Sequence, residues 1–157
     1  MIIGILSDSH DNLPVIARAV SFFNRQKAGF VFHCGDFVAP FTIDRLMKLE
    51  CDWLGVFGNN EGEKKGLAAK SGGRIGKPPL KKKMGGRSIV VVHDIASLAL
   101  KGPKPDLVAF GHNHMPSVEV RCGTLFVNPG ECSGWLSGVP TVALVDLDAM
   151  SARIVKI

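Results

Sequence analysis

Several features are missing from this chain of 157 residues, and each absence excludes a class of protein to which it could belong. No apolar run approaches the roughly 18 residues needed to cross a bilayer. The opening segment lacks a basic region and its apolar stretch stops at Asp8, so it is a poor signal peptide and a better buried strand. The chain also has no internal repeat and no low-complexity linker. We therefore expect one cytoplasmic domain over residues 1–157, with no membrane partner.

Cysteine pairs with metal-binding or redox spacing are also missing. The chain has four cysteines and no C-x-x-C motif, which argues against a zinc or redox function for the thiols. In a reducing cytosol, buried free thiols are the simplest expectation. The four residues are Cys34, Cys51, Cys122 and Cys132.

Basic residues are present in excess, and they are unevenly spread. Hydrophobic residues make up 46% of the chain and charged residues 21%, which is typical of a packed globular protein. The net charge is +5, yet residues 64–87 alone hold nine lysines and arginines and no acidic residue. Such a segment suits an anionic partner, for example a phosphate ester or a nucleic acid. A solvated basic surface explains it equally well.

The first half of the chain alternates short apolar runs with stretches of helical length. Strands that alternate with helices imply parallel strands joined by right-handed crossovers. The predicted strands are Ile2–Ser7, Phe30–Cys34 and Trp53–Phe57, and the predicted helices are Leu13–Lys27 and Pro40–Leu49. Residues 62–79, rich in glycine and lysine, predict a loop or a short helix.

The second half of the chain predicts hairpins. Gly85-Gly86 is typical of a two-residue turn, and a second hairpin surrounds Cys122-Gly123-Thr124. The predicted strands are Leu80–Met84, Ser88–His93, Leu107–Gly111, Val118–Arg121, Leu125–Asn128, Thr141–Asp146 and Arg153–Lys156. Parallel units followed by hairpins predict an α/β fold, in which two mixed β-sheets pack as a sandwich flanked by helices.

Side chains that can bind metal follow several of the predicted strands. They are Asp8 and His10, Asp36, Asn59, His93, and His112 and His114, in chain order. In open parallel sheets, ligands bind beyond the carboxyl ends of the strands, so these loops can meet at one site. Mixed oxygen and nitrogen ligands suit Mn, Fe or Zn rather than Ca. A carboxylate can bridge two cations, and Asp36 is the candidate for that position.

Each short motif also has an ordinary structural explanation. A lone Asp-x-His pair is mostly a surface turn or a cap, and Gly-Asn-Asn is a common turn. A lone His-x-His binds metal in a minority of cases. Gly35, Gly58 and Gly111 precede ligands, where a small residue permits tight turns and close backbone approach. Because the motifs occur together, in order and at strand ends, they favour a metal site.

The ordered motifs resemble those of the calcineurin-like metallophosphoesterase superfamily. The matching residues are Asp8-Ser-His10, Gly35-Asp36, Gly58-Asn59-Asn60, His93 and Gly111-His112-Asn113-His114. The short chain and its Asn128-Pro-Gly130 turn are similar to the small, single-domain, YfcE-type phosphodiesterase branch. The resemblance covers nearly the whole chain, and it implies the same α/β sandwich, with an αββα arrangement.

The resemblance also implies two divalent metal ions. The first would be bound by Asp8, His10, Asp36 and His114, and the second by Asp36, Asn59, His93 and His112. Mn²⁺ is the favoured metal, with Ni²⁺, Fe²⁺, Co²⁺ and Zn²⁺ as alternatives.

The activity implied by the resemblance is hydrolysis of phosphate esters, with a hydroxide that bridges the two metals attacking phosphorus in line. The catalytic residues carried over from the family are Asp36, Asn59, Asn60 and His93. A small phosphodiester or phosphate ester is the favoured substrate. The mean hydropathy of +0.19 is also compatible with a homo-oligomer.

Asn60 departs from the pattern of many larger family members, which have at this position a histidine that assists the leaving oxygen. An amide can hydrogen-bond phosphate but cannot donate a proton as an acid. The one histidine left over, His33, lies inside a predicted strand, where a core or supporting position is favoured over catalysis. His93 is followed by Asp94-Ile95, where the family often has Gly-His.

Four further side chains near the motifs carry specific expectations. Asp11 and Asp94 neighbour the ligand loops and are candidates for orienting imidazoles. Glu131 would repel phosphate, so we expect it to point away from the site or to pair with a lysine. Trp135 could stand at the rim of the site, although core packing is favoured.

Two other functions compete with the enzyme. The superfamily includes a protein-trafficking scaffold that keeps the fold without key site residues, but here all seven ligand positions are chemically competent. A nuclease is favoured by the basic residues 64–87 and their attraction for phosphate. Few aromatic residues lie in that segment, so base stacking there has little support and nucleic acid is the less favoured partner.

The absence of an acid at Asn60 predicts a preference for acidic leaving groups. We expect bis-p-nitrophenyl phosphate to react at least about 100-fold faster than alkyl phosphates, because general acid catalysis is worth that much or more to a poor leaving group. Initial rates on the two substrate classes check this. Equal rates would show that another group protonates the leaving oxygen.

Overall fold

The structure is a computed structural model that describes residues 1–99 and 102–157. Its first sheet has six strands in the order β11-β10-β1-β2-β3-β4. Strands β1 to β4 are parallel, whereas β10 is antiparallel to both β1 and β11. The strands are β1 (Ile2–Leu6), β2 (Phe30–His33), β3 (Trp53–Val56), β4 (Ile75–Gly76), β10 (Thr141–Asp146) and β11 (Ser151–Lys156).

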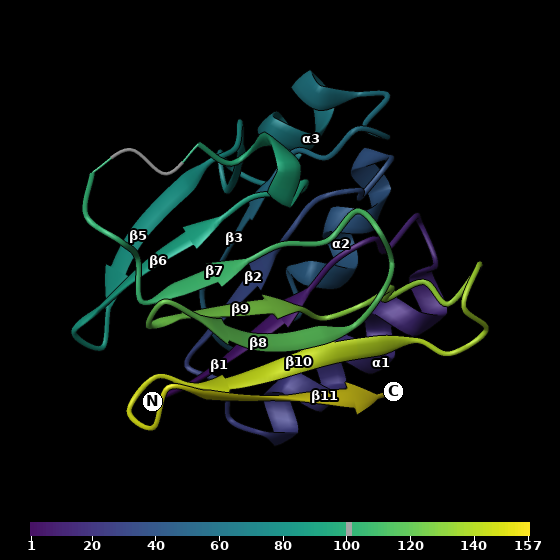
Figure 1. Ribbon diagram of the computed structural model, residues 1–157. Coiled ribbons are helices and arrows are strands. Elements are labelled where there is room, and N and C mark those ends of the chain that lie inside the picture. Colours follow the sequence, from purple (N-terminus) through teal and green to yellow (C-terminus); the bar gives the residue numbers. More distant parts are fainter. Residues whose placement is uncertain (100–101) are drawn as a thin grey trace.

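The second sheet has five strands in the order β5-β6-β7-β9-β8 and lies in front of the first in Figure 1. Strands β6, β7 and β9 are parallel, and the edge strands β5 and β8 are antiparallel to their neighbours. The strands are β5 (Leu80–Met84), β6 (Arg87–Val91), β7 (Leu107–Ala109), β8 (Ser117–Arg121) and β9 (Thr124–Asn128). The predicted α/β sandwich of two mixed sheets is confirmed.

Both predicted hairpins are present. Gly85 and Gly86 have φ angles of 55° and 72°, which suit a two-residue turn between β5 and β6. The β8–β9 turn consists of Cys122 and Gly123, with φ angles of 51° and 82°. Only glycine adopts such angles without strain, so Cys122 is held there by the pairing of the two strands.

Helices pack against the outer face of the six-stranded sheet (Figure 1). Helix α1 (Leu13–Arg25) buries one apolar stripe and tolerates Pro14 in its first turn, where no N–H is required. The predicted helix 40–49 is shorter, because it consists of the 3₁₀ turn η1 (Pro40–Thr42) and one turn of α2 (Ile43–Leu46). The segment predicted as a loop or a short helix contains α3 (Lys64–Lys70) and the two-residue strand β4.

Two apolar layers hold the sandwich together. The layer between the sheets contains side chains such as Ile5, Phe32 and Leu107. The layer beneath the helices contains Phe23, whose ring lies over Gly4 of β1. This arrangement fixes both sheets with their loops at a common end, where the parallel strands finish.

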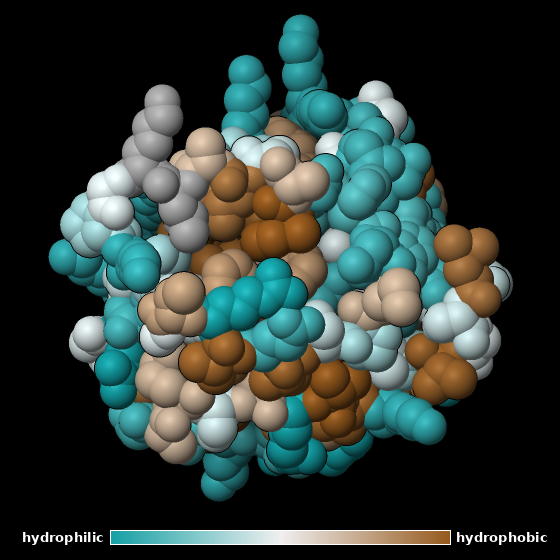
Figure 2. Space-filling view, in the orientation of Figure 1, coloured by the Kyte–Doolittle hydropathy of each residue, from teal (hydrophilic) through white to brown (hydrophobic). Residues whose placement is uncertain are grey.

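The outer face of the five-stranded sheet is covered differently. A small apolar cluster around Val90, Val108 and Phe110 packs against Phe126 of β9 and against Ile95 and Leu98, in and next to the turn η2 (Ile95–Ser97). Figure 2 shows an apolar patch on this side of the molecule. Within residues 1–99 and 102–157, the α-helices lie on the other sheet, and no helix has the length and apolar content to span a membrane.

The cysteines follow the expectation only in part. All four are free thiols in the structure, and Cys34 and Cys132 are fully buried as predicted. Cys51 is half-buried, and Cys122 is exposed, so the prediction of a buried thiol is wrong for Cys122. Its position in a hairpin turn at the edge of a sheet explains the exposure.

Gly4 is required by the packing of α1 on the sheet. A Cβ at this position would lie 2.5 Å from the Phe23 ring, so we expect Gly4→Ala to lower the free energy of unfolding by about 1–3 kcal/mol. Gly62→Ala is the matched control, because nothing lies within 4 Å of its Cβ position. Urea unfolding of the two variants checks this, and equal midpoints would mean that the helix can shift without cost.

Candidate metal centre

The seven predicted metal-binding side chains meet at one end of the sandwich. The loops after β1, β2 and β3 carry Asp8, His10, Asp36 and Asn59, and the loops after β6 and β7 carry His93, His112 and His114. The contacts described below join all seven into one cluster. Four of them therefore come from the six-stranded sheet and three from the five-stranded sheet.

One half of the cluster contains Asp8, His10 and His114, whose ligand atoms lie close enough to hold one ion. The carboxylate Oδ1 of Asp8 is 3.3 Å from Nε2 of His114 and 3.9 Å from Nε2 of His10. Among the described residues, neither Asp8 Oδ1 nor His10 Nε2 has a hydrogen-bond partner, although both atoms are buried. Burial of polar atoms without partners is costly, and a bound cation would remove that cost.

The other half of the cluster contains His93, Asn59 and His112. The side-chain oxygen of Asn59 is 2.8 Å from Nε2 of His93 and 2.9 Å from Nδ1 of His112. Nδ1 of His93 lies 2.9 Å from the carbonyl oxygen of Cys34, which can only accept, so that nitrogen carries the proton. Nε2 of His93 and Nδ1 of His112 therefore meet at the Asn59 oxygen, which places two nitrogen donors and one oxygen donor around one point.

Asp36 lies between the two halves. Its Oδ1 is 3.5 Å from Nε2 of His93, and its Oδ2 is 3.7 Å from Nε2 of His10. The backbone and side-chain amides of Asn60 donate to the two carboxylate oxygens at 2.9 and 2.7 Å. Burial raises the pKa of Asp36, but the Asn60 hydrogen bonds and the nearby His93 outweigh it and lower the pKa overall. The position suits a carboxylate shared by two cations.

Asp8, like Asp36, is almost completely buried. Burial raises its pKa, and the nearby Ser7 hydroxyl and the imidazoles of His93 and His114 offset only part of that effect. Two carboxylates this close are stable together as anions only beside positive charge. A second candidate group of ligand atoms, from Asp8, Asp36 and His93, shows how closely the two acids approach.

The backbone of this cluster adopts conformations that side chains rarely take. Asp8, His10, Asp36, His112 and His114 all have positive φ angles, between 40° and 73°. Left-handed backbone at residues other than glycine costs energy and gathers at functional sites. Five of the seven predicted ligands are therefore held in strained geometry that aims their side chains inward.

Glycines allow the ligand loops to approach one another. A Cβ at Gly58 would overlap the Asp36 carboxylate, and one at Gly111 would overlap Ser7 and Asp8. Gly35 has a φ angle of 106°, and a Cβ there would lie 2.7 Å from Nδ1 of His93 and 2.9 Å from the backbone of Gly58. The expectation that these three glycines permit close backbone approach is confirmed.

Glu61 was not identified from the sequence. Its Oε1 accepts N–H groups of Asp36 at 3.0 Å and Gly58 at 2.8 Å, so it joins the loops that carry Asp36 and Asn59. Burial raises its pKa to about 7, although these backbone hydrogen bonds favour the carboxylate. Its sequence position, directly after Gly58-Asn59-Asn60, is the one signal that could have revealed it.

Glu131 does not behave as predicted. It is buried, and it neither points away nor pairs with a lysine among the described residues. Its carboxylate accepts the hydroxyl of Ser133 and the N–H groups of Leu136 and Ser137, while Oε1 lies 3.6 Å from Nδ1 of His114. Burial raises its pKa, but these donors outweigh it and hold the pKa at about 2. The local donors of the 131–137 loop thus replace the lysine that was expected.

Asp11 and Asp94, the predicted supports of the imidazoles, have other partners. Asp11 accepts from Ala39 N–H and from the Thr42 hydroxyl, and Asp94 accepts from Ala96 N–H as a cap of η2. Within the described residues neither hydrogen-bonds an imidazole, so that prediction is wrong. The carbonyl of Cys34 and the carboxylate of Glu131 lie next to His93 and His114 instead.

His33 occupies the supporting position that the sequence favoured. It is fully buried, its Nδ1 accepts Gly35 N–H at 3.1 Å, and its Nε2 is 2.9 Å from the Ser9 hydroxyl. Burial lowers its pKa well below the usual value, so the ring is neutral. The ring stacks on Phe37 and lies beneath the loops that carry the ligands.

Trp135 lies at the rim of the site and not in the core, so the favoured prediction of core packing is wrong. Its side chain is exposed, and its Nε1 donates to the carbonyl oxygen of His10 at 3.2 Å. A hollow of about 510 Å³ opens here. It is lined by His10, Val38, Asn60, His114, Glu131, Trp135 and Leu136.

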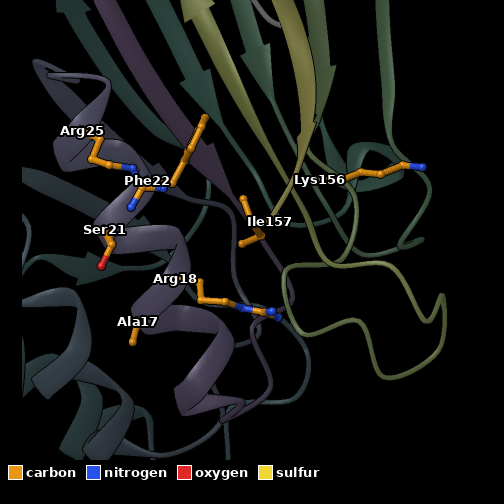
Figure 3. Close-up of a pocket in the computed structure, with 7 residues that line it drawn as sticks. All are labelled: Ala17, Arg18, Ser21, Phe22, Arg25, Lys156 and Ile157. Carbon is orange, nitrogen blue, oxygen red and sulfur yellow. The ribbon is translucent and has the colours of Figure 1, made fainter.

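Another hollow of about 510 Å³ lies elsewhere on the molecule, so size alone does not identify the site. Figure 3 shows it between helix α1 and the C-terminal residues, with Arg18, Phe22 and Ile157 among its lining residues. It shares no described residue with the cluster of seven. The converging ligand atoms, and not the volume, distinguish the hollow beside Trp135.

Solved structures resemble this fold closely. A novel archaeal phosphodiesterase superposes with a TM-score of 0.89 at 33% sequence identity, over 100% of both chains. YfcE, a phosphoesterase from E. coli, superposes with a TM-score of 0.77 at 20% identity over 100% of both chains, which shows a shared fold.

Sequence comparison gives the family. Phosphodiesterase MJ0936 of Methanocaldococcus jannaschii is 34% identical over 161 residues, which cover 98% of this chain and 97% of the relative. Residues 1–150 match the calcineurin-like phosphoesterase superfamily domain. The chain belongs to the calcineurin-like phosphoesterase superfamily, as its motifs predicted. Membership implies a divalent metal cofactor, and the cluster offers groups of side chains that could hold one.

Glu131 should stabilise the protein in a manner that depends on pH. Glu131→Gln leaves part-buried N–H donors facing a neutral amide in place of a carboxylate, so we expect the free energy of unfolding of the metal-free protein to fall by about 1–3 kcal/mol near pH 7. Because the folded pKa lies near 2, the difference from the unmodified protein is complete above about pH 4.5 and shrinks as the pH falls toward 2.

Urea unfolding of the metal-free protein at several pH values measures this difference. Glu119→Gln is the matched control, since Glu119 is exposed and pairs only with Arg121 among the described residues. Its effect should stay within about 0.5 kcal/mol. Equal effects of the two substitutions, or a difference that grows in acid, would contradict the assigned contacts.

Proposed function

We propose that the protein is a metal-dependent phosphodiesterase that hydrolyses small phosphate diesters with two divalent cations. The observation that carries the proposal is the convergence of seven oxygen and nitrogen donors, several of them buried and without partners, at the end of both sheets. Both the structural comparison, at 33% identity, and the sequence comparison, at 34% identity, match a phosphodiesterase, which supports the substrate class.

In this proposal the two halves of the cluster correspond to the two cations. The first is held by Asp8, His10, Asp36 and His114, and the second by Asp36, Asn59, His93 and His112. The contacts of Asn59 with His93 and His112, and of Asp8 with His114, support this division. Mixed oxygen and nitrogen donors support Mn²⁺ as the metal, with Ni²⁺, Fe²⁺, Co²⁺ or Zn²⁺ as alternatives.

A dinuclear centre of this kind supplies a nucleophile at neutral pH and offsets charge on the phosphoryl group. The chain's own residues orient the centre. The Cys34 carbonyl fixes the proton of His93 on Nδ1, which leaves Nε2 free as a ligand. Asn60 holds both oxygens of Asp36, which sets the direction of the shared carboxylate.

Asn60 also lines the hollow that faces the centre, so its amide is available to a bound phosphate. It cannot protonate the leaving oxygen, in keeping with the expected preference for acidic leaving groups. The catalytic residues of the proposal are therefore Asp36, Asn59, Asn60 and His93.

The basic residues 64–87 do not support a nuclease. Within the described part of the chain, none of their lysines lines the hollow beside the centre. Lys70 pairs with Asp44, and Lys82 lies over the Phe30 ring. A small substrate is favoured for this reason. We also propose a cytoplasmic location, which four free thiols support.

Metal add-back with Asp36→Asn tests the proposal. The purified protein is stripped of metal and assayed on bis-p-nitrophenyl phosphate with Mn²⁺, Ni²⁺, Co²⁺, Zn²⁺ and Mg²⁺ returned one at a time. We expect metal-dependent turnover that Asp36→Asn lowers by at least about 100-fold. Loss of a residue that only hydrogen-bonds a metal ligand costs up to about 100-fold, and Asp36 is itself a proposed ligand.

Asp44→Asn is the control, because Asp44 is an exposed carboxylate that pairs with Lys70 away from the cluster. It should keep full turnover. Two bound metals per chain without turnover on any ester would favour the scaffold function. Turnover that is unaffected by metal removal would exclude the proposed centre.

A further inference from the structure

An exposed tryptophan stands beside the proposed metal centre. Trp135 is 65% exposed and the adjacent Leu136 is 81% exposed. Both line the same hollow as His10, Asn60 and His114. The loop that carries them projects at the right of Figure 1, and apolar side chains gather at the same place in Figure 2. Two large apolar side chains therefore line a hollow that the proposed ligands His10 and His114 also line.

The loop is fastened firmly to the ligand loops. Cys132 N–H and Ser133 N–H donate to the carbonyl oxygens of Ser7 and Asp8, at 2.9 and 3.0 Å. The Asn12 side chain donates to the Ser133 carbonyl at 2.8 Å. The exposed position of Trp135 is thus set by hydrogen bonds that tie its loop to the segment after β1.

Glu131 anchors the other end of the loop. Its carboxylate accepts the N–H groups of Leu136 and Ser137, directly after Trp135, and faces His114. The indole N–H of Trp135 itself donates to the carbonyl of His10. The one polar atom of the ring is therefore satisfied, and the apolar faces of the ring remain for another molecule.

We propose that Trp135 and Leu136 form a subsite for a planar aromatic ring carried by the substrate's phosphate, either a nucleobase or an aryl group. The inference rests on the proposed function, which puts phosphate at the cations. Trp135 contacts the backbone of His10, so a substituent on that phosphate lies within reach of the ring. Aromatic rings bind flat groups by stacking with little dependence on their identity.

A protein partner is the competing occupant of this wall. The hollow favours a small molecule, because four of its seven lining residues are proposed ligands, Asn60 or the supporting Glu131. A partner chain that covered Trp135 would also cover the approach to the cations. The experiment below separates the two occupants.

The test compares ligands that share a phosphate and differ in the ring. Binding of AMP, phenyl phosphate and ribose 5-phosphate to the metal-loaded protein is measured by calorimetry. We expect AMP or phenyl phosphate to bind about 5- to 150-fold more tightly than ribose 5-phosphate, the range that one stacked ring provides. Tighter binding of AMP than of phenyl phosphate identifies a nucleobase subsite, and the reverse or equal binding identifies an aryl subsite.

Tryptophan fluorescence gives a second measurement that does not depend on turnover. The chain has no tyrosine and two tryptophans, and Trp53 is only 3% exposed. Quenching by acrylamide therefore reports Trp135, and AMP should protect it where ribose 5-phosphate does not.

Substitutions assign the effect to the ring. Trp135→Ala should abolish the preference for ring-bearing ligands and leave ribose 5-phosphate binding unchanged, and Trp135→Phe should keep part of the preference. Met47→Ala, at an exposed apolar residue of the helical layer, is the control and should change neither.

Several outcomes would overturn the subsite. They are equal binding of AMP, phenyl phosphate and ribose 5-phosphate, an equal loss for all three in Trp135→Ala, and a change of oligomeric state in Trp135→Ala with the preference intact. Ring-selective binding in a protein that hydrolyses no diester would leave the subsite standing and reject the proposed function, so the two failures are distinguishable.

Discussion

The burial of polar ligand atoms without hydrogen-bond partners is the constraint on which the arrangement of this protein depends. The Asn59 oxygen faces two imidazole nitrogens at 2.8 and 2.9 Å, and the Asp8 carboxylate faces His114 without a hydrogen-bond donor for Oδ1 among the described residues. Such a cluster does not assemble for the sake of stability. It persists because the surrounding structure fixes it, and a cation would convert its cost into binding free energy.

The fixing is done by the backbone and by two buried glutamates. Positive φ angles at five of the seven residues direct side chains inward, against the local preference of the chain. Glu61 ties the Asp36 loop to the Gly58 loop, and Glu131 ties the Trp135 loop to the surroundings of His114. Glu61 lies next to Asp36, and Glu131 lies next to His114. Each binds backbone N–H groups of loops that the sheets alone would leave loosely defined.

The sequence predicted most of the fold because its signals are local. The alternation of strands and helices predicted the parallel strands of the first half, and Gly85-Gly86 predicted the β5–β6 hairpin. Short motifs at strand ends predicted the seven side chains that meet at one end of the sandwich. The two-residue strand β4 was missed, since it is defined only by its pairing with β3.

The wrong predictions concern contacts between distant segments. Glu131 was expected to point away from the site, because a carboxylate repels phosphate. The sequence does not reveal that residues 133–137 fold around this carboxylate and donate hydrogen bonds to it. Trp135 was expected in the core because tryptophan is large and apolar. Its exposed position is set by a hydrogen bond to His10, which lies 125 positions away in the sequence. Asp11 and Asp94 sit next to ligands in sequence, yet their partners are a helical turn and a cap. Neighbours in sequence were thus poor guides to which groups support the imidazoles.

The origin of the seven side chains has a consequence for the life of the protein in the cell. Four come from one sheet and three from the other. The layer between the sheets is apolar, and apolar contacts are not directional. Under the proposed ligation each cation is bound by residues of both sheets at the end of the sandwich. Each metal site therefore forms only when both sheets are folded and packed together. Binding to the folded state alone raises its population by mass action. A shortage of metal would therefore lower the amount of the protein that survives degradation, as well as its rate of reaction.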